Sequence, residues 1–198
     1  MHITQRQHEI IVGTLLGDGC LERIGRFIRL KIGHGISQKQ YFWWKYYALR
    51  SLTSKTSKPR MIRQFHRVTK KYYESLHFAT KSIPELEKYW VQFYSDGKKI
   101  INSDMQELTP LSTAVWYMDD GYKRNDCNAF RLSTDAFSVN NQKRLQHLLT
   151  KNFGVASTLH KKGFYWNIYI PNKQSQRFLE VIKPYIHKSL KYKIALAP

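Results

Sequence analysis

The chain repeats one order of elements twice, and this repeat constrains its fold more than any other feature. Hydrophobic periodicity predicts helix, strands, helix, strands and helix in the first part, and the same order returns at a spacing of about 100 residues. In each copy the first helix ends in an acidic turn with glycine, at residues 17–19 and 119–121. The repeat predicts two similar α+β halves, each of order αββαββα, related by a pseudo-two-fold axis.

Caps and turn residues place the single elements of this pattern. Thr4 and Ser37 are expected to cap the first two helices, and Pro84 opens the third. Helices are predicted at residues 4–16, 38–52, 84–94, 110–120, 138–153 and 172–186, and strands at 20–24, 27–33, 61–68, 71–80, 128–135, 156–162 and 164–170. The halves then comprise residues 1–95 and 110–198, joined by a polar linker over residues 96–109.

The excess of basic residues indicates which kind of molecule this protein binds. The 198 residues include 33 lysines and arginines against 14 acidic residues, a formal net charge of +19. So basic a chain favours a polyanionic partner. Nucleic acid is favoured over a membrane surface because the basic residues are spread through strand-like segments rather than along one amphipathic helix. No apolar run approaches the roughly 20 residues needed to span a bilayer.

Cysteine and histidine usage adds no further site. Cys20 and Cys127 are too few for a disulfide framework and are expected to be reduced, and histidines such as His8, His34 and His160 lack zinc-ligand spacing. The opening MHITQRQHEI lacks the apolar core of a secretory signal. We therefore expect an intracellular protein, acting in an organelle matrix or another compartment where its gene is expressed.

The two acidic helix ends are the strongest candidate for a chemical site. Gly13 and Gly17 lie one turn apart on one face of the first helix, where missing side chains let another helix approach closely. The corresponding residues of the second copy are Val115 and Asp119. Side-by-side packing would bring Asp18 and Asp120 together beside two helix C-termini. Their mutual repulsion would favour bound cations, of which Mg²⁺ is the natural one.

The segments VGTLLGDG, residues 12–19, and AVWYMDDG, residues 114–121, resemble the paired motifs of the single-chain LAGLIDADG homing endonucleases, in particular the subgroup whose second motif reads WYMDDG. The resemblance covers nearly the whole chain. It implies a central pair of motif helices and two antiparallel sheets that form a saddle over a long DNA site. It also implies a monomeric, intron-encoded or freestanding enzyme that promotes the spread of its own gene.

The resemblance implies a metal-dependent cut in each DNA strand. Asp18 and Asp120 would be catalytic metal ligands, with Gly17 and Asp119 in the metal set. The side chain of Asp119 is expected to face the helix interface and accept hydrogen bonds. Two or three divalent ions are expected. Mg²⁺ would serve, Mn²⁺ would substitute, and Ca²⁺ would bind without supporting turnover.

The resemblance also implies a lysine from each half beside the metals, which suits phosphodiester hydrolysis because positive charge offsets the charge that develops in the transition state. Family resemblance points to Lys193 and Lys99, with Lys98 as an alternative to Lys99. Opposite strands approach closely across the minor groove, about 6 Å wide, so two adjacent carboxylates could address one phosphate each. The expected reaction is in-line attack of a metal-activated water, giving a short stagger.

Recognition of DNA is assigned to the strands, whose alternate side chains face outward. The outward sets mix side chains that can read base edges. The predicted contacts are Arg29, Lys31, Gln64, His66, Ser75 and His77 in the first half, and Arg131, Ser133, Tyr165, Asn167 and Tyr169 in the second. The remaining lysines and arginines are expected to contact phosphate.

Two other functions fit the same basic scaffold. An RNA maturase that assists intron splicing would have intron RNA as its partner, and a regulator would bind double-stranded DNA without cutting it. Neither function needs paired metal-binding carboxylates. Retention of Asp18 and Asp120 therefore favours cleavage over both alternatives.

Overall fold

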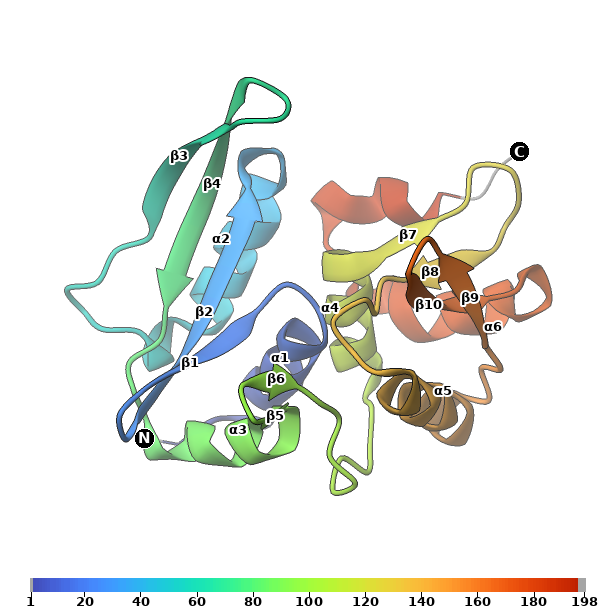
Figure 1. The fold of residues 1–198 in the computed structure, drawn as a ribbon, viewed down its shortest axis with the longest axis horizontal. Coiled ribbons are helices and arrows are strands. Elements are labelled where there is room, and N and C mark those ends of the chain that lie inside the picture. The colour runs from blue at the N-terminus through green and yellow to red at the C-terminus, as the bar shows by residue number, and fades with distance from the viewer. Residues whose placement is uncertain (1, 196–198) are drawn as a thin grey trace.

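The computed structural model describes residues 2–195 and contains two αββαββα halves (Figure 1). The first half contains α1 (Gln5–Leu16), β1 (Cys20–Ile24), β2 (Phe27–Gly35), α2 (Lys39–Ala48), β3 (Arg60–His66), β4 (Lys71–Ala79) and α3 (Glu87–Phe93). The second contains α4 (Pro110–Asp120), β7 (Gly121–Lys123), β8 (Phe130–Leu132), α5 (Val139–Phe153), β9 (Thr158–Lys162), β10 (Tyr165–Ile170) and α6 (Asn172–Ile182). The predicted α+β class and element order are confirmed. Residue 1 and residues 196–198, at the outer ends of the predicted halves, lie outside the described range.

Each half contains one four-stranded antiparallel sheet, and the two sheets have the same topology. The strand orders are β1-β2-β4-β3 and β7-β8-β10-β9. A short hairpin of β5 (Tyr94–Ser95) and β6 (Lys98–Lys99) lies between the halves in sequence. The shared strand order is the structural counterpart of the sequence repeat.

The helices bury one face of each sheet and leave the other open. In β2, Ile28, Leu30 and Ile32 point into the core, whereas Lys31 on the opposite face is exposed. Helix α2 covers the buried side of the first sheet, and α5 and α6 pack against β10 of the second (Figure 1). Within residues 2–195, no helix is both long and apolar enough to cross a membrane.

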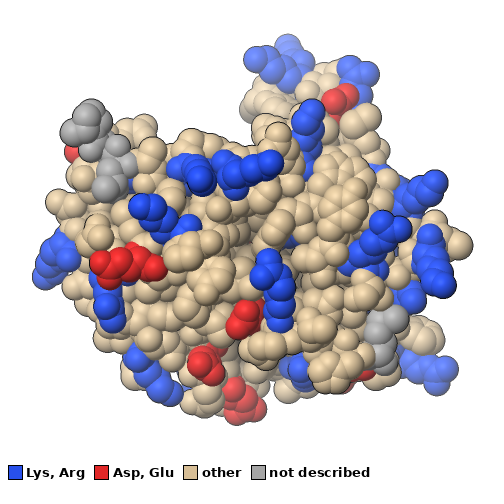
Figure 2. Space-filling view, turned by 180° about the vertical axis from the view of Figure 1, so that it is seen from behind, with Lys and Arg blue, Asp and Glu red and all other residues tan. Residues whose placement is uncertain are grey.

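Basic side chains are spread over the surface rather than gathered on one helix. Figure 2 shows lysine and arginine over both halves, with acidic side chains in a few small groups. The upper edge of this view is hollowed beside the projecting hairpin of β3 and β4. Every residue of β3 is exposed, so this hairpin extends beyond the cover that α2 provides.

One local prediction was wrong, and two short elements were not predicted. Ser37 does not cap α2, because a 3₁₀ turn over Ile36–Gln38 precedes the helix and Gln38 stands at its start without a side-chain cap. Strand β7 was missed, since its three residues are too few to show alternation and it is defined by pairing with β8. A 3₁₀ segment over Lys188–Ile194 was also missed.

The central feature is the close contact of α1 with α4. Capping boxes start both helices, formed by Thr4 with Gln7 and by Thr109 with Ser112. A Cβ atom added to Gly13 would lie 2.3 Å from the Ser112 carbonyl oxygen and 2.7 Å from the Val115 Cβ. The predicted glycine face of the first helix is confirmed, because the Gly13 backbone lies directly against the Ser112 carbonyl and the Val115 side chain.

We expect Gly13→Ala to lower the free energy of unfolding by about 1–3 kcal/mol, because the helices must separate to admit the methyl group. Gly35→Ala is the matched control, since its nearest atom would be the Ser37 Oγ at 3.9 Å and its φ of −58° suits alanine. Urea unfolding of the three proteins measures both effects. Equal losses in the two variants would contradict a specific helix contact.

Candidate active site

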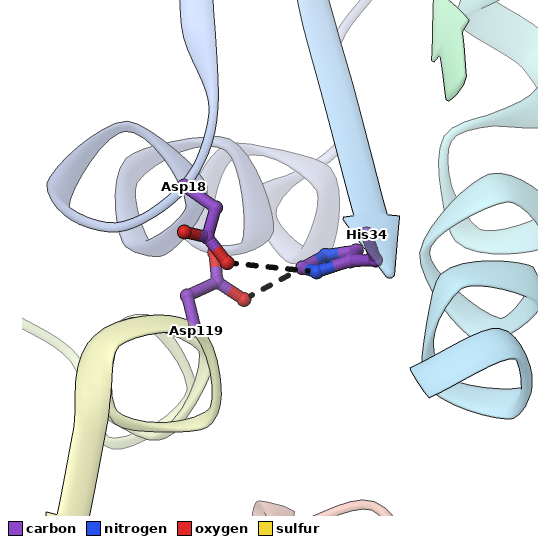
Figure 3. A group of neighbouring side chains, drawn as sticks. All are labelled: Asp18, His34 and Asp119. Atoms are coloured by element: carbon purple, nitrogen blue, oxygen red, sulfur yellow. Dashed lines mark ion pairs between the residues drawn. The ribbon is translucent and has the colours of Figure 1, made fainter. Parts of the chain in front are cut away.

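The C-terminal ends of α1 and α4 place the acidic residues of both motifs beside one another. Helix α1 ends at Leu16, where the Gly17 amide still donates to the Gly13 carbonyl at 3.1 Å. Asp18 follows this glycine, and Figure 3 shows its carboxylate beside that of Asp119, near the end of α4. Asp120 is the last residue of α4. The predicted approach of the two acidic ends is therefore observed.

The carboxylates of Asp18 and Asp120 have raised pKa values, because nearby positive charge does not compensate for burial and mutual repulsion. Burial, with repulsion from Asp18 and Asp119, raises the pKa of Asp120 to about 7. Burial and repulsion from Asp119 also raise the pKa of Asp18, although His34, Lys45 and Lys193 oppose the shift. Within residues 2–195, the Asp120 carboxylate forms no ion pair. Such carboxylates would gain from a bound cation.

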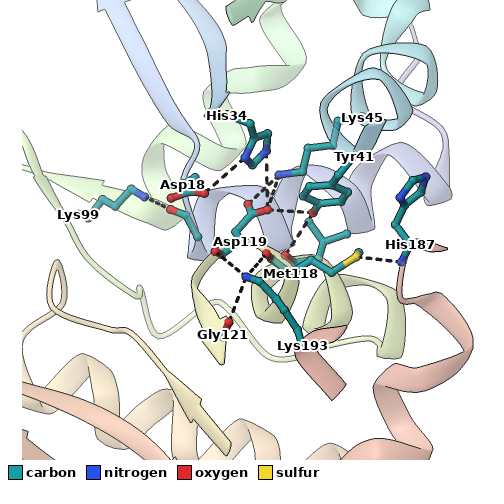
Figure 4. A network of polar contacts seen from close by, with 12 residues as sticks. Asp18, His34, Tyr41, Lys45, Lys99, Met118, Asp119, Gly121, His187 and Lys193 are labelled. Atoms are coloured by element: carbon teal, nitrogen blue, oxygen red, sulfur yellow. Dashed lines mark hydrogen bonds and ion pairs between the residues drawn. The ribbon is translucent and has the colours of Figure 1, made fainter. Parts of the chain in front are cut away.

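Two lysines reach the same helix ends from distant parts of the chain (Figure 4). The Lys99 Nζ donates to the Gly17 carbonyl oxygen at 3.0 Å. The Lys193 Nζ donates to the Met118 and Gly121 carbonyl oxygens at 2.7 and 3.1 Å and lies 3.4 Å from that of Asp119. Burial lowers the pKa of both lysines, while the nearby aspartates oppose the shift.

The two lysine positions repeat across the pseudo-two-fold axis. Each ammonium group lies on the carbonyl of the residue before a motif aspartate, Gly17 for Lys99 and Asp119 for Lys193. Lys98, the alternative to Lys99, is exposed. The structure thus brings Lys99 to the helix ends, which is the arrangement expected of the lysine predicted for that half.

The donor atoms at the helix ends fit a hard divalent cation. Asp18 and Asp120 offer carboxylate oxygens, and Gly17 and Asp119 offer backbone carbonyl oxygens. Oxygen donors of this kind suit Mg²⁺ and Mn²⁺. Two ammonium groups already lie on these carbonyls, which indicates that the position favours positive charge.

The carboxylate of Asp119 has a different role from the one its place in the metal set suggests. It is buried, and both of its oxygens accept hydrogen bonds from the Lys45 Nζ at 2.7 Å. The Tyr41 hydroxyl donates to Oδ1 at 2.8 Å. Its predicted position at the interface is confirmed. Because the carboxylate is already paired, we expect the Asp119 carbonyl oxygen rather than the carboxylate to face a metal ion.

His34, Tyr41 and Lys45 were missed as members of the site. The His34 Nδ1 lies 3.5 Å from Asp18 Oδ2, and its Nε2 lies 3.9 Å from Asp119 Oδ1 (Figure 3). Asp18, His34 and Asp119 offer possible metal-ligand atoms within 4.8 Å of one another, although Lys45 already binds the Asp119 carboxylate. Strand alternation gave a usable signal, because it placed a polar His34 in the inward register of β2.

Strand pairing places the six predicted DNA-contact residues of the first half on one open face. In β4, His77 lies across from Gly33 of β2 and Arg60 of β3, and Ser75 lies two residues away on the same side. The complete set on this face is Arg29, Lys31, Gln64, His66, Ser75 and His77. Glu22 forms ion pairs with both Arg29 and Lys31. On binding DNA, Arg29 and Lys31 would leave the Glu22 carboxylate and contact phosphates or bases instead.

One predicted DNA contact in the second half was wrong. Arg131 and Tyr169 pair across strands, and Tyr165 is exposed on the same face as Ser133. Asn167 belongs to this register but is only 1% exposed, and its side-chain oxygen accepts the Thr134 amide at 3.1 Å. Alternation gave the correct face, but the asparagine caps a neighbouring loop instead of facing outward.

Comparison with known sequences places the chain among DNA endonucleases and their relatives. A sequence model described as the LAGLIDADG DNA endonuclease family matches residues 8–178. The DNA endonuclease I-ChuI of Chlamydomonas applanata is 31% identical, over 98% of this chain and 97% of that protein. The cytochrome b mRNA maturase bI2 of Debaryomyces hansenii is 29% identical, over 94% of this chain and 72% of that protein.

Solved structures confirm the fold. The homing endonuclease I-WcaI, bound to its DNA recognition sequence, superposes with a TM-score of 0.91 and 23% identity, covering all of this chain and 89% of that one. I-DmoI, in complex with DNA and Mn, gives a TM-score of 0.54 and 13% identity, covering 88% of this chain and 94% of that one.

Lys45→Met is expected to lower the free energy of unfolding by about 3–5 kcal/mol, because it leaves the buried Asp119 carboxylate unpaired. The double variant Lys45→Met, Asp119→Asn should recover most of that loss, since no buried charge remains. Denaturant unfolding of the single and double variants tests the pair. Additive losses would show that Lys45 and Asp119 are not energetically coupled.

Relative to the unsubstituted protein, Asp120→Asn should be more stabilising at pH 8 than at pH 5, with both measurements made in EDTA. The pKa of Asp120 rises from an ordinary 3.8 to about 7 on folding, so the folded state binds this proton more tightly. Stability of the unsubstituted protein therefore falls as pH rises through that window. We expect the difference between the two proteins to change by about 1 kcal/mol, after allowance for partial exposure. A pH-independent difference would contradict the raised pKa.

Proposed function

This chain belongs to the LAGLIDADG DNA endonuclease family, and we propose that it is a homing endonuclease that cuts both strands of a long, asymmetric DNA site. The observation that carries the proposal is the meeting of Asp18 and Asp120 at adjoining helix ends, with one half-buried lysine beside each motif. Each half would supply one essential carboxylate.

The site residues divide the work of phosphodiester hydrolysis. Asp18 and Asp120, with the carbonyls of Gly17 and Asp119, would hold two or three divalent ions, Mg²⁺ in use and Mn²⁺ as a substitute. When bound, these ions supply a water of lowered pKa and stabilise the leaving oxygen. Lys99 and Lys193 would offset the negative charge that develops on the phosphate. Because these ammonium groups are already held in place, this stabilisation requires no reorganisation of solvent.

The open faces of the two sheets would bind the DNA on either side of these helix ends. A net charge of +19 supplies affinity that does not depend on sequence and falls with salt. Side chains such as Gln64 and Arg131 would read base edges. Because the halves differ in sequence, the site need not be palindromic, and one monomer carries both catalytic carboxylates.

A maturase is the second candidate, because a relative covering nearly the whole chain bears that name. A basic surface would serve intron RNA as well as DNA. RNA binding alone gives no reason, however, to hold two carboxylates with raised pKa values against each other. The same consideration weighs against a regulator that binds DNA without cutting it.

We expect cleavage of a randomised DNA-site library with Mg²⁺ and none with EDTA. Asp18→Asn and Asp120→Asn should abolish double-strand cutting, because each removes one carboxylate. Asp104→Asn, an exposed residue outside the site, is the matched control and should cut normally. Sequencing the cut ends gives the target. Tight, salt-sensitive binding to RNA or DNA without cutting would instead favour the maturase or the regulator.

A further inference from the structure

The two sheets have matching registers, which allows residues around the two aspartates to be compared. Cys20, two residues after Asp18, pairs with Lys31. Tyr122, two residues after Asp120, pairs with Arg131. Three residues beyond these partners stand His34 in the first half and Thr134 in the second. By this count His34, in β2, corresponds to Thr134, which follows the end of β8.

These corresponding residues meet their aspartates differently. The His34 ring lies within 3.5 Å of the Asp18 carboxylate, and it is buried. The Thr134 hydroxyl instead donates to the Trp166 carbonyl oxygen at 3.3 Å. Beside Asp120 there is a hollow of about 170 Å³, lined by residues that include Lys99 and Thr134. A ring thus fills the space next to one carboxylate, and open space adjoins the other.

The position of His34 is fixed by a polar cluster that the second half lacks. Its ring packs against that of Tyr41, with centroids 5.1 Å apart, and Tyr41 and Lys45 both bind Asp119. Tyr41 and Lys45 are fully buried on α2. The corresponding helix of the second half, α5, has no lysine among its buried residues, which are Gln142, Leu145, Leu148, Leu149 and Phe153.

We propose that the two cleavage centres are unequal, because His34 is a positioning residue that orients the Asp18 carboxylate and makes the strand served by Asp18 the faster one to be cut. This inference rests on the proposed function. The Nδ1 atom lies 3.5 Å from Asp18 Oδ2, and the buried ring limits the positions open to that carboxylate. A ligand oriented by a fixed neighbour loses less freedom on metal binding. Asp120 has no such partner within residues 2–195.

The test follows each strand of the selected site separately, with the two 5′ ends labelled differently. The unsubstituted protein should cut one strand faster. His34→Phe keeps a ring of similar size but removes both nitrogens, and it should slow that strand by about tenfold. The other strand should stay within about twofold of its rate. His34→Asn, whose amide can donate from nearly the position of Nδ1, should restore part of the loss.

Thr134→Val is the matched control at the corresponding position, and it should leave the faster strand unchanged. Two measurements without turnover complete the design. DNA affinity in Ca²⁺ and the unfolding temperature of His34→Phe should both match those of the unsubstituted protein, since binding and folding do not depend on the ring nitrogens.

The outcomes separate the inference from the function on which it rests. If the unsubstituted protein cuts neither strand, the proposed function fails. If it cuts both strands at equal rates, or if His34→Phe slows both strands equally, the function stands and the inference is overturned. The same holds if Thr134→Val slows the faster strand as much as His34→Phe does.

Discussion

The close approach of α1 and α4 is the contact on which the rest of the structure depends. Gly13 and Gly17 have no side chains to hold the helices apart, so Val115 and Asp119 pack directly against their backbones. This packing brings two helix C-termini together and forces carboxylates into a partly buried space. The raised pKa values of Asp18 and Asp120 are a consequence of that geometry. The electrostatic repulsion between these carboxylates destabilises the protein without metal and favours the binding of cations.

The chain offsets this repulsion with lysines drawn from three separate elements. Lys45 comes from α2, Lys99 from β6 and Lys193 from the C-terminal 3₁₀ segment. Only Lys45 makes a direct ion pair, with Asp119, while the other two bind backbone carbonyls. Asp119 is thereby neutralised inside the protein, whereas Asp18 and Asp120 keep their need for positive charge. The three acidic residues of the two motifs thus divide into one structural group and two chemical ones.

The features that follow a repeating pattern along the chain could be predicted from the sequence. The repeat predicted the element order, glycine spacing predicted the helix contact, and strand alternation predicted the open faces of the sheets. Prediction was less successful where a role depends on contacts between distant segments. Lys45 lies 74 residues from Asp119, and no local pattern shows that this lysine is buried against it. Asn167 sits in the outward register yet turns its amide to the Thr134 backbone, which alternation alone does not show.

The pairing of Gly17 with Asp119 also bears on self-association. A symmetric dimer of the second half would set Asp119 against its own copy, with two carboxylates crowded where a glycine now provides the space. Neither copy would bring a Lys45, because that lysine belongs to the other half. The first half alone would place Gly17 against Gly17 and leave a gap instead. Each half is therefore complementary to the other and is a poor partner for a second copy of itself.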